Sequence, residues 1–204
     1  MTENIQEHWE KVYSKTTNEN RGWYQKTPVI SLEFLDITGA HTGKKIIDVG
    51  GGTSHLAELI DANQNELTVI DISKNAIEEL KAHEKNHSRH INWIVGDITS
   101  IELPDKYDIW HDRAVFHFLI EEKQRKSYID RLNQYLKSGG WLIMATFSPT
   151  GPEKCSGLPV ERYSPASLSE TLGENFVLKK SSEYTHITPS GKTQDYIYCL
   201  FQKK

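Results

Sequence analysis

The chain has 204 residues and a formal charge of −4, with 37% hydrophobic and 25% charged residues, which is typical of one globular domain spanning residues 1–204. It contains no apolar run of about 18 residues, and its polar N-terminus lacks the apolar core of a signal peptide, so we expect neither a membrane span nor secretion. The acidic balance argues against a nucleic-acid surface, and two cysteines, Cys155 and Cys199, exclude a disulfide framework and favour a reduced, cytoplasmic setting.

The first 40 residues precede the first expected strand and contain several aromatic side chains. Four apolar or aromatic residues fall there at helical spacing: Ile5, Trp9, Val12 and Tyr13. They predict a short amphipathic helix, and a second helix should begin at Pro28 and end near Gly39. Trp9, Tyr13 and Tyr24 either cover the edge of a sheet or form the roof of a ligand pocket, and the pattern alone leaves both interpretations open.

Residues 45–60 have the pattern of a buried strand, a glycine loop and a helix. Ile46, Ile47 and Val49 form a short apolar run that is typical of a parallel strand buried on both faces. Three glycines follow it directly: Gly50, Gly51 and Gly52. Only glycine lets the chain turn tightly while its backbone approaches a ligand closely. Thr53 and Ser54 are the expected N-cap residues of a helix that carries three apolar residues at helical spacing: Leu56, Leu59 and Ile60.

Two acidic residues sharpen this interpretation of the glycine loop. Asp48 lies two residues before Gly50, inside the end of a strand, where a lone carboxylate has no evident structural role. Asp71 ends a second apolar strand at 67–70, about 21 residues after Gly50, which is the spacing of an acid that binds ribose hydroxyls. Because a carboxylate can accept two hydrogen bonds from a cis diol, we expect Asp71 to bind a ribose.

The remaining sequence alternates between strand and helix patterns. The expected elements are, in chain order, a helix capped by Ser73 and carrying Ala76, Ile77 and Leu80, a strand at 91–95, a strand at 107–111, a helix carrying Ile129, Leu132 and Leu136 with its C-cap at 138–140, and a strand at 141–147. Two long strands at 174–187 and 193–202 should then form a hairpin around residues 188–192. The alternation predicts a parallel sheet with helices on both faces.

The glycine loop also resembles a known family motif. The first motif of class I S-adenosylmethionine (SAM)-dependent methyltransferases runs acid-x-Gly-x-Gly-x-Gly, and this chain reads Asp48-Val49-Gly50-Gly51-Gly52-Thr53-Ser54, with Ser54 in place of the last glycine. The dinucleotide pattern of NAD enzymes fits less well, because His55 occupies its third glycine position. The resemblance covers nearly the whole chain, including the terminal hairpin. It implies an α/β, Rossmann-like fold with a seven-stranded, mostly parallel sheet whose last strand is antiparallel, and SAM as the cofactor.

The resemblance also implies a division of labour within the single domain. Residues 1–40 would form a helical cover or lid, and residues 41–204 the SAM-binding core. The implied cofactor-binding residues are Trp9, Tyr13, Asp48, Gly50, Gly51, Gly52, Asp71, Ile72, Asp97, Ile98 and His111. Asp97 would accept a hydrogen bond from the adenine amino group, while Ile72 and Ile98 would enclose the ring. Alternatively, Asp97 only caps the turn that follows it.

The segment after the fourth strand should open onto the site of methyl transfer. Its run Trp110-His111-Asp112-Arg113-Ala114 resembles a stretch of thiopurine-type small-molecule methyltransferases, and it lacks the Asn/Asp-Pro-Pro-Tyr motif of enzymes that methylate DNA bases and glutamine. The expected catalytic residues are His111, His117 and Tyr24, with a histidine as general base, although His117 could simply pack beneath a helix. Arg113 offers a fork for a carboxylate unless it pairs with Asp112, and the long loop at 147–159 provides Cys155 as a substrate contact.

One further motif is a coincidental match in our interpretation. The run His83-Glu84-Lys85-Asn86-His87 fits the H-E-x-x-H pattern of zinc proteases. That motif needs a partly buried helix, whereas Lys85, Asn86 and the residues that follow indicate a solvated helix end. We therefore expect no metal site.

These patterns favour a SAM-dependent methyltransferase that acts on a small-molecule acceptor, such as a thiol or a carboxylate. The N-terminal aromatic pattern is also similar to that of protein-lysine methyltransferases, so a protein substrate is the alternative. A nicotinamide-dependent oxidoreductase and an inactive SAM-binding module remain as hypotheses from other classes. No nucleic-acid or membrane partner is expected.

Overall fold

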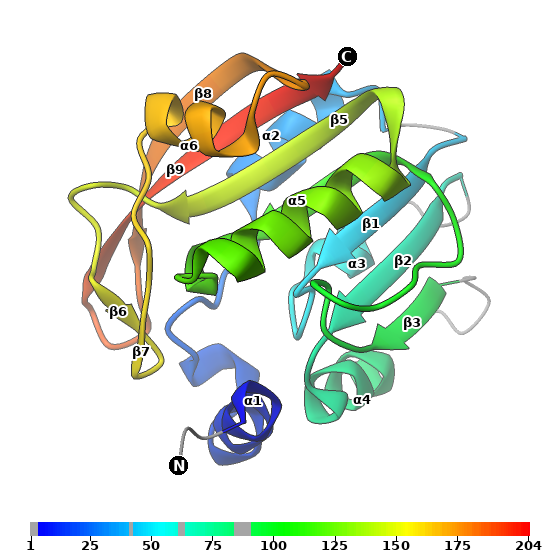
Figure 1. Cartoon of the computed structure of the whole chain (residues 1–204). Coiled ribbons are helices and arrows are strands. Elements are labelled where there is room, and N and C mark those ends of the chain that lie inside the picture. Colours follow the sequence, from blue (N-terminus) through cyan, green and yellow to red (C-terminus); the bar gives the residue numbers. More distant parts are fainter. Residues whose placement is uncertain (1–3, 41–42, 61–63, 84–90) are drawn as a thin grey trace.

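A central sheet organises the computed structural model, which describes residues 4–40, 43–60, 64–83 and 91–204. Its strands are, in chain order, β1 (Lys45–Val49), β2 (Glu66–Asp71), β3 (Ile91–Val95), β4 (Tyr107–Arg113), β5 (Leu136–Phe147), β8 (Phe176–Ile187) and β9 (Thr193–Lys203). They lie in the order β3-β2-β1-β4-β5-β9-β8 (Figure 1). Strands β1 to β5 are parallel to one another, and β9 lies antiparallel between β5 and β8. The predicted seven-stranded, mostly parallel sheet with an antiparallel last strand is confirmed.

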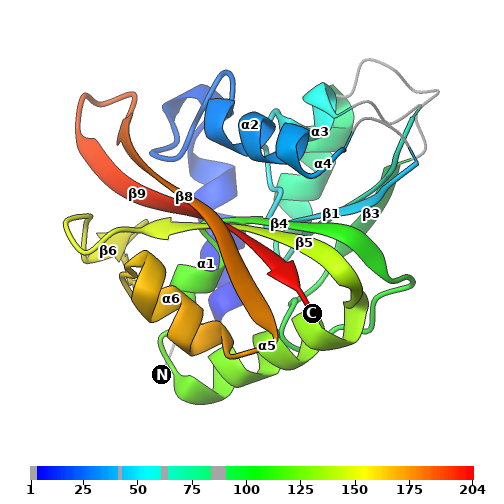
Figure 2. The same ribbon diagram turned by 90° about the horizontal axis from the view of Figure 1, so that it is seen from above.

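Helices cover both faces of this sheet, as the alternating pattern predicted. They are α1 (Ile5–Lys15), α2 (Val29–Ile37), α3 (Leu56–Leu59), α4 (Lys74–His83), α5 (Glu122–Tyr135) and α6 (Pro165–Leu172). Figure 2 shows α5 and α6 on one face and α2, α3 and α4 on the other. In the part of the chain that the structure describes, none of the helices has the length and apolar character needed to cross a membrane.

The two faces of the sheet bury separate hydrophobic cores because successive strand residues point in opposite directions. In β4, Trp110 packs toward α5, where its indole donates a 2.9 Å hydrogen bond to the hydroxyl of Tyr128. Its neighbour Ile109 belongs to the other core, together with Phe34 of α2 and Ile77 of α4. The polar residues of β4 also alternate between the two faces, so each of them can make contacts on one side of the sheet.

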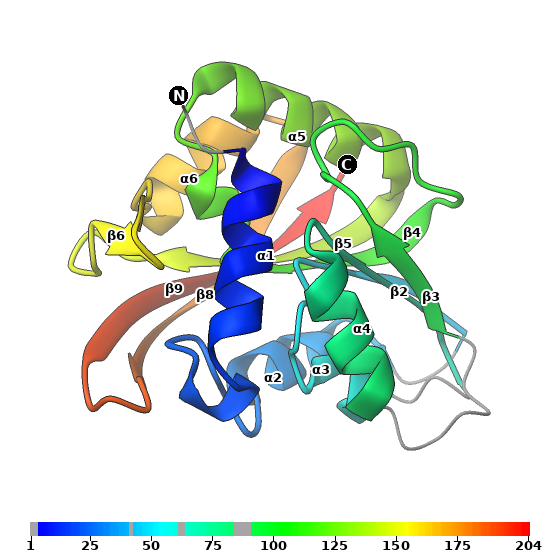
Figure 3. The same cartoon turned by 90° about the horizontal axis from the view of Figure 1, so that it is seen from below.

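Helix α1 crosses the edge of the sheet at which the parallel strands end (Figure 3). The carboxylate of Glu10 accepts hydrogen bonds from the backbone N–H of Lys74 at 2.7 Å, from that of Asn75 at 3.1 Å and from the Ser73 hydroxyl at 2.8 Å. An acidic side chain at a helix N-terminus satisfies otherwise unpaired N–H groups and opposes the positive end of the helix dipole. Helix α1 is therefore docked on the start of α4.

The helix after the glycine loop is shorter than the sequence predicted. Helix α3 has only four residues, and its N-cap position is held by His55 rather than by Thr53 or Ser54. The hydroxyl of Thr53 accepts a hydrogen bond from Arg21 at 2.9 Å and donates one to Asn18 at 2.8 Å. Thr53 therefore anchors the N-terminal segment instead of capping a helix.

The predicted boundary between α5 and β5 was wrong. Helix α5 ends at Tyr135, and the chain enters β5 at once, because Leu136 pairs with Tyr107 of β4. The predicted cap at 138–140 lies inside β5, next to an irregularity in its pairing with β4. Gly139, with a φ of 75°, serves this irregular strand rather than a helix end.

A hairpin and a helix after β5 were missed. The loop predicted at 147–159 contains a small hairpin, β6 (Lys154–Cys155) and β7 (Leu158–Pro159), which turns at Ser156 and Gly157 with φ values of 51° and 82°. Helix α6 begins after Ser164, whose hydroxyl accepts from the Ser167 N–H at 3.1 Å, and it has proline in its first turn.

Candidate active site

The carboxyl ends of β1, β2 and β4 form the candidate site. Strand β1 pairs with β2 on one side and with β4 on the other, so the strand order reverses at β1. Ligands of doubly wound sheets bind at such a switch point. The predicted residues Asp48, Asp71 and His111 come together there, with Asp48 directly opposite His111 in the register of β1 and β4.

Close contacts explain why the loop after β1 consists of glycines. At Gly50, which has a φ of 64°, an added Cβ would lie 2.0 Å from a methyl group of Val115. At Gly51, it would lie 2.6 Å from Val69 and 2.9 Å from Oδ2 of Asp48. Both substitutions would force neighbouring atoms to move. The glycine loop keeps the backbone close to Asp48 and places no side chain against that carboxylate.

Asp48 is 2% exposed, and its two carboxylate oxygens differ. Oδ1 lies 2.7 Å from Nδ1 of His111, whereas Oδ2 is buried without a hydrogen-bond partner among the described residues. A buried unpaired carboxylate oxygen is costly, and such groups are typical of sites that take a ligand. The carboxylate therefore offers one free acceptor to a positively charged donor.

Asp71 is 5% exposed, and α1 covers it directly. Oδ1 accepts a 2.8 Å hydrogen bond from the N–H of Ser73, and the Tyr13 hydroxyl lies 3.5 Å from Oδ2. Burial raises the pKa of Asp71 to about 7, although both hydrogen bonds oppose the shift. Burial also raises the pKa of Tyr13 well above its usual value, so the phenol is neutral and can donate. The same hydroxyl would lie 2.4 Å from a Cβ at Gly52.

The two tryptophans of the N-terminal segment, Trp9 and Trp23, pack around Tyr13. Trp9 makes edge-to-face contacts with Trp23 and Phe118, with ring centroids 6.0 and 5.0 Å apart. Its ring centroid lies 6.2 Å from that of Tyr13. Trp9 and Tyr13 are thus joined in one aromatic group, which lies over the glycine loop through Tyr13. The position of this group fits both interpretations from the sequence, a cover on the edge of the sheet and a roof over a ligand pocket.

Asp97 follows β3 and caps the turn after it. Its Oδ1 accepts hydrogen bonds from the backbone N–H and the hydroxyl of Thr99, both at 2.8 Å. Ile98 is 5% exposed and belongs to the core on the side of α5, whereas Ile72 is half-buried after β2. This geometry matches the turn-capping alternative for Asp97, and its adenine contact stays a prediction.

Neither histidine predicted as a base is open to solvent. His111 is 2% exposed, and its ring nitrogens lie 2.7 Å from Asp48 and 2.9 Å from the Ser31 hydroxyl. His117 is fully buried against Phe118 and Phe147, and burial lowers its pKa to about 3. His117 is therefore neutral and matches the packing alternative, while the partners of His111 indicate a positioning role.

Arg113 lies two residues after His111 on the same face of β4. It is half-buried, and its Nη1 donates to the Trp23 carbonyl at 3.0 Å. Asp112 points the other way, where it accepts hydrogen bonds from Tyr128 at 2.5 Å and Val115 at 2.9 Å. The alternative pairing of Arg113 with Asp112 is thus wrong. Among the described residues, no carboxylate forms an ion pair with Arg113.

The electrostatic field of Arg113 reaches several further side chains, among them Cys155, His186 and Tyr196. Cys155 of β6 is 7% exposed, and burial raises the pKa of its thiol to about 11, so the thiol is protonated at neutral pH. The positive charge of Arg113 also acts on His186 and Tyr196, which belong to the terminal hairpin. No local pattern pointed to these two residues, because only the folded sheet brings β8 and β9 to the end of β4.

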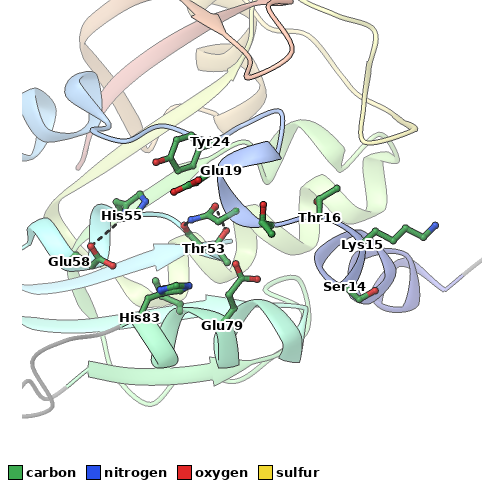
Figure 4. A pocket seen from close by; sticks show the side chains of 13 residues that line it. Ser14, Lys15, Thr16, Glu19, Tyr24, Thr53, His55, Glu58, Glu79 and His83 are labelled. Atoms are coloured by element: carbon green, nitrogen blue, oxygen red, sulfur yellow. Dashed lines mark hydrogen bonds and ion pairs between the residues drawn. The ribbon is translucent and has the colours of Figure 1, made fainter.

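A cavity of about 610 Å³ lies beside this site rather than in it (Figure 4). Its walls come from the end of α1, the following segment, α3 and α4, and its ionisable side chains include Lys15, Glu19, His55, Glu58, Glu79 and His83. The cavity shares Tyr24 with the predicted site, but Asp48, Asp71 and the glycine loop do not line it. Tyr24 packs there against His55, with ring centroids 5.7 Å apart.

The zinc-like motif can be followed only in part. His83 ends α4 at this cavity, while Glu84, Lys85, Asn86 and His87 lie outside the described residues. Within residues 4–40, 43–60, 64–83 and 91–204, no cluster of three histidine, cysteine, aspartate or glutamate side chains could hold a metal ion.

Comparisons with known proteins place this geometry in context. A family model described as a methyltransferase domain matches residues 47–142. The ubiquinone biosynthesis O-methyltransferase of Chromobacterium violaceum is 23% identical over 159 residues, which cover 77% of this chain and 62% of that protein. The eEF1A lysine and N-terminal methyltransferase of Mus musculus is 24% identical over 132 residues, covering 62% of this chain and 18% of that protein. The chain thus spans less than two thirds of the length of either relative.

A solved structure agrees over almost the whole chain. The N-methyltransferase NodS from Bradyrhizobium japonicum WM9, in complex with S-adenosylhomocysteine, superposes with a TM-score of 0.71 at 16% identity, covering 95% of this chain and 97% of that one. At this identity the similarity establishes the fold alone.

Proposed function

With a class I methyltransferase fold and a methyltransferase domain match as the premise, we propose that this chain transfers a methyl group from SAM to a small-molecule acceptor. The observation that carries the proposal is the pair of buried carboxylates, Asp48 and Asp71, on either side of a glycine loop at the switch point. SAM contains both a ribose diol and an ammonium group, which are the donors that two such carboxylates accept.

The residues at the switch point fit the cofactor. Asp71 would hold the ribose hydroxyls, and the unpaired Oδ2 of Asp48 would accept from the ammonium group. Gly51 leaves room beside that oxygen, since a Cβ there would approach it to 2.9 Å. Bound SAM would supply a methyl group that its sulfonium makes electrophilic, so the protein chiefly orients the acceptor and excludes water.

Residues 4–40 would act as a cover over the cofactor. Tyr13 lies on Asp71 in the free protein, so the ribose would have to replace this contact. Trp9 and Trp23 could then close over the ligand from the same segment. Such a cover shields the reacting group from water, at a cost in affinity for its rearrangement.

The affinity for S-adenosylhomocysteine should rise about tenfold between pH 6 and pH 8. The pKa of Asp71 is about 7 in the free protein, and only its ionised form accepts charge-assisted hydrogen bonds from the ribose hydroxyls on both oxygens. At pH 6, binding must first remove a proton from most molecules, whereas at pH 8 most carboxylates are already ionised. Calorimetry at pH 6, 7 and 8 measures this slope. Asp71→Asn should bind weakly with no such pH dependence, and an equal slope in that variant would assign it to another group.

Arg113 supports an anionic acceptor. It is a half-buried cation that no described carboxylate neutralises, and its guanidinium can bind a carboxylate through two parallel hydrogen bonds. The charge of Arg113 acts on Cys155, His186 and Tyr196, and none of them adds a negative charge at neutral pH. The similarity of Trp110–Ala114 to a stretch of thiopurine-type enzymes supports a small acceptor beside Arg113.

Arg113→Lys should raise the KM for an anionic acceptor about tenfold and leave the SAM affinity nearly unchanged. Lysine keeps the charge but loses the planar fork. Arg125→Lys, on the start of α5, is the matched control, since among the described residues its guanidinium donates hydrogen bonds to the carbonyls of Leu119 and Ile120. If Arg113→Lys loses SAM or unfolds, Arg113 is a structural residue and the argument for an anionic acceptor fails.

A protein acceptor is the second candidate function, because the mouse relative is named a lysine and N-terminal methyltransferase. Release of S-adenosylhomocysteine from SAM, measured with a panel of small acids and thiols and separately with proteins, tests both candidates. Turnover with small molecules supports the first proposal, and turnover with proteins alone supports the second. No turnover with either class would indicate an inactive SAM-binding module.

A further inference from the structure

A chain of hydrogen bonds links the end of strand β1 to helix α2. It consists of Asp48 on β1, His111 on β4 and Ser31 on α2, which are 2%, 2% and 0% exposed. His111 Nδ1 lies 2.7 Å from Asp48 Oδ1, and His111 Nε2 lies 2.9 Å from the Ser31 hydroxyl. Three buried polar side chains from three separate elements therefore fix one another.

The chemistry of these groups determines the direction of the first hydrogen bond. A carboxylate only accepts, so Nδ1 of His111 carries a proton and donates it to Oδ1 of Asp48. The Ser31 hydroxyl can donate to or accept from Nε2, so it holds the ring in either protonation state. The ring can then neither flip nor rotate without breaking both contacts.

The orientation of the ring also determines which oxygen of Asp48 is available. Because Oδ1 is bound to His111, Oδ2 is left as the buried oxygen with no partner among the described residues. Oδ2 lies on the side of Gly51, where an added Cβ would approach it to 2.9 Å. The absence of a side chain at Gly51 therefore leaves a close approach to that oxygen open.

We propose that His111 and Ser31 are positioning residues, which hold the Asp48 carboxylate so that Oδ2 meets the ammonium group of the cofactor. This inference rests on the proposed function, and it replaces the predicted role of His111 as a general base. The ammonium is the appropriate partner because it carries N–H donors and a full charge, whereas the sulfonium carries no N–H. The sequence pattern did not point to Ser31, because only the folded chain brings its hydroxyl to His111.

Two ligands separate this positioning role from a general effect on the fold. S-adenosylhomocysteine contains the amino-acid end, and 5′-methylthioadenosine contains the nucleoside and the thioether without it. His111→Gln places its amide nearer the position of Nε2, and we expect it to weaken S-adenosylhomocysteine binding about tenfold. Ser31→Ala should weaken it about threefold. Neither variant should change the affinity for 5′-methylthioadenosine appreciably.

His111→Asn is the conservative variant, since its amide can donate from near the position of Nδ1. We expect it to retain most of the affinity for S-adenosylhomocysteine. Thr146→Val is the matched control: Thr146 is a fully buried residue of β5 whose hydroxyl has no described partner, and its loss should affect neither ligand. Thermal unfolding of each variant, without ligand, shows whether the protein remains folded.

The outcomes are distinct. If the wild-type protein binds neither ligand, the proposed function fails. If it binds both, and His111→Gln and Ser31→Ala lose both ligands equally or lose neither, the positioning role is overturned. It is also overturned if His111→Asn binds S-adenosylhomocysteine no better than His111→Gln does. Selective loss of the ligand with the amino-acid end, rescued by asparagine, supports the proposal.

Discussion

Replacing Asp71 with alanine should weaken SAM binding at least tenfold and leave the fold intact. The carboxylate would accept charge-assisted hydrogen bonds from the ribose diol, and losing them costs about 1.5–3 kcal/mol. The fold should survive because burial raises the pKa of Asp71 to about 7. The pKa of this carboxyl is higher in the folded protein than in the unfolded chain, so folding becomes less favourable as the pH rises from about 4 to about 7. At pH 7, alanine removes this unfavourable ionisation.

Calorimetric titration with SAM measures the expected loss, and thermal unfolding checks the fold. Asp130→Ala is the control, because it removes a carboxylate from the exposed surface of α5, far from the switch point. Its affinity should equal that of the wild type. If Asp71→Ala also binds SAM with unchanged affinity, the cofactor must lie elsewhere in the molecule.

Arg21→Ala should destabilise the protein by about 2–3 kcal/mol and release the N-terminal segment. Arg21 is 2% exposed and donates to the Tyr13 and Thr16 carbonyls at 2.9 and 2.7 Å. It also forms an ion pair with Glu79 at 2.7 Å and a 2.9 Å hydrogen bond to Thr53. Alanine would leave these acceptors without a donor, and the partial exposure of Glu79 limits the cost.

Urea unfolding measures the free energy, and trypsin cleavage after the exposed Lys15 reports on the segment itself. Cleavage should be faster in Arg21→Ala, and in the wild type it should slow when S-adenosylhomocysteine is present. Arg131→Ala is the control, since Arg131 forms a 2.6 Å ion pair with Glu102, whose side chain is 72% exposed. Equal wild-type cleavage with and without ligand would show that the segment is structural and not a cover.

The core of the fold was readable from local patterns. Parallel strands buried on both faces, such as Lys45–Val49, form apolar runs, and the glycine loop marks where the first of them ends. The end of α5 was not readable, because the pairing of Leu136 with Tyr107 stops the helix from a distance of about 29 residues. The missed helix Pro165–Leu172 did carry a local signal, a serine followed by proline at its start.

In the candidate site too, the sequence pointed to the residues with a local pattern and missed those that distant contacts bring in. Asp48 and Asp71 were found because their spacing from the glycine loop is a local property of the sequence. Ser31 and His186 were not, because Ser31 meets His111 across 80 positions and His186 meets the Gly22 carbonyl across 164. Such partners become visible only when the sheet brings the N-terminal segment and the terminal hairpin to the same edge.

A pair of calorimetric titrations of the purified protein, one with SAM and one with NAD, decides which cofactor the glycine loop binds. Both ligands suit a glycine loop followed by a ribose-binding acid, but only SAM carries an amino-acid ammonium for Asp48. We expect SAM to bind at one site per chain and NAD to give no saturable heat. Saturable NAD binding without SAM binding would contradict the assignment and identify the chain as a nicotinamide-binding protein.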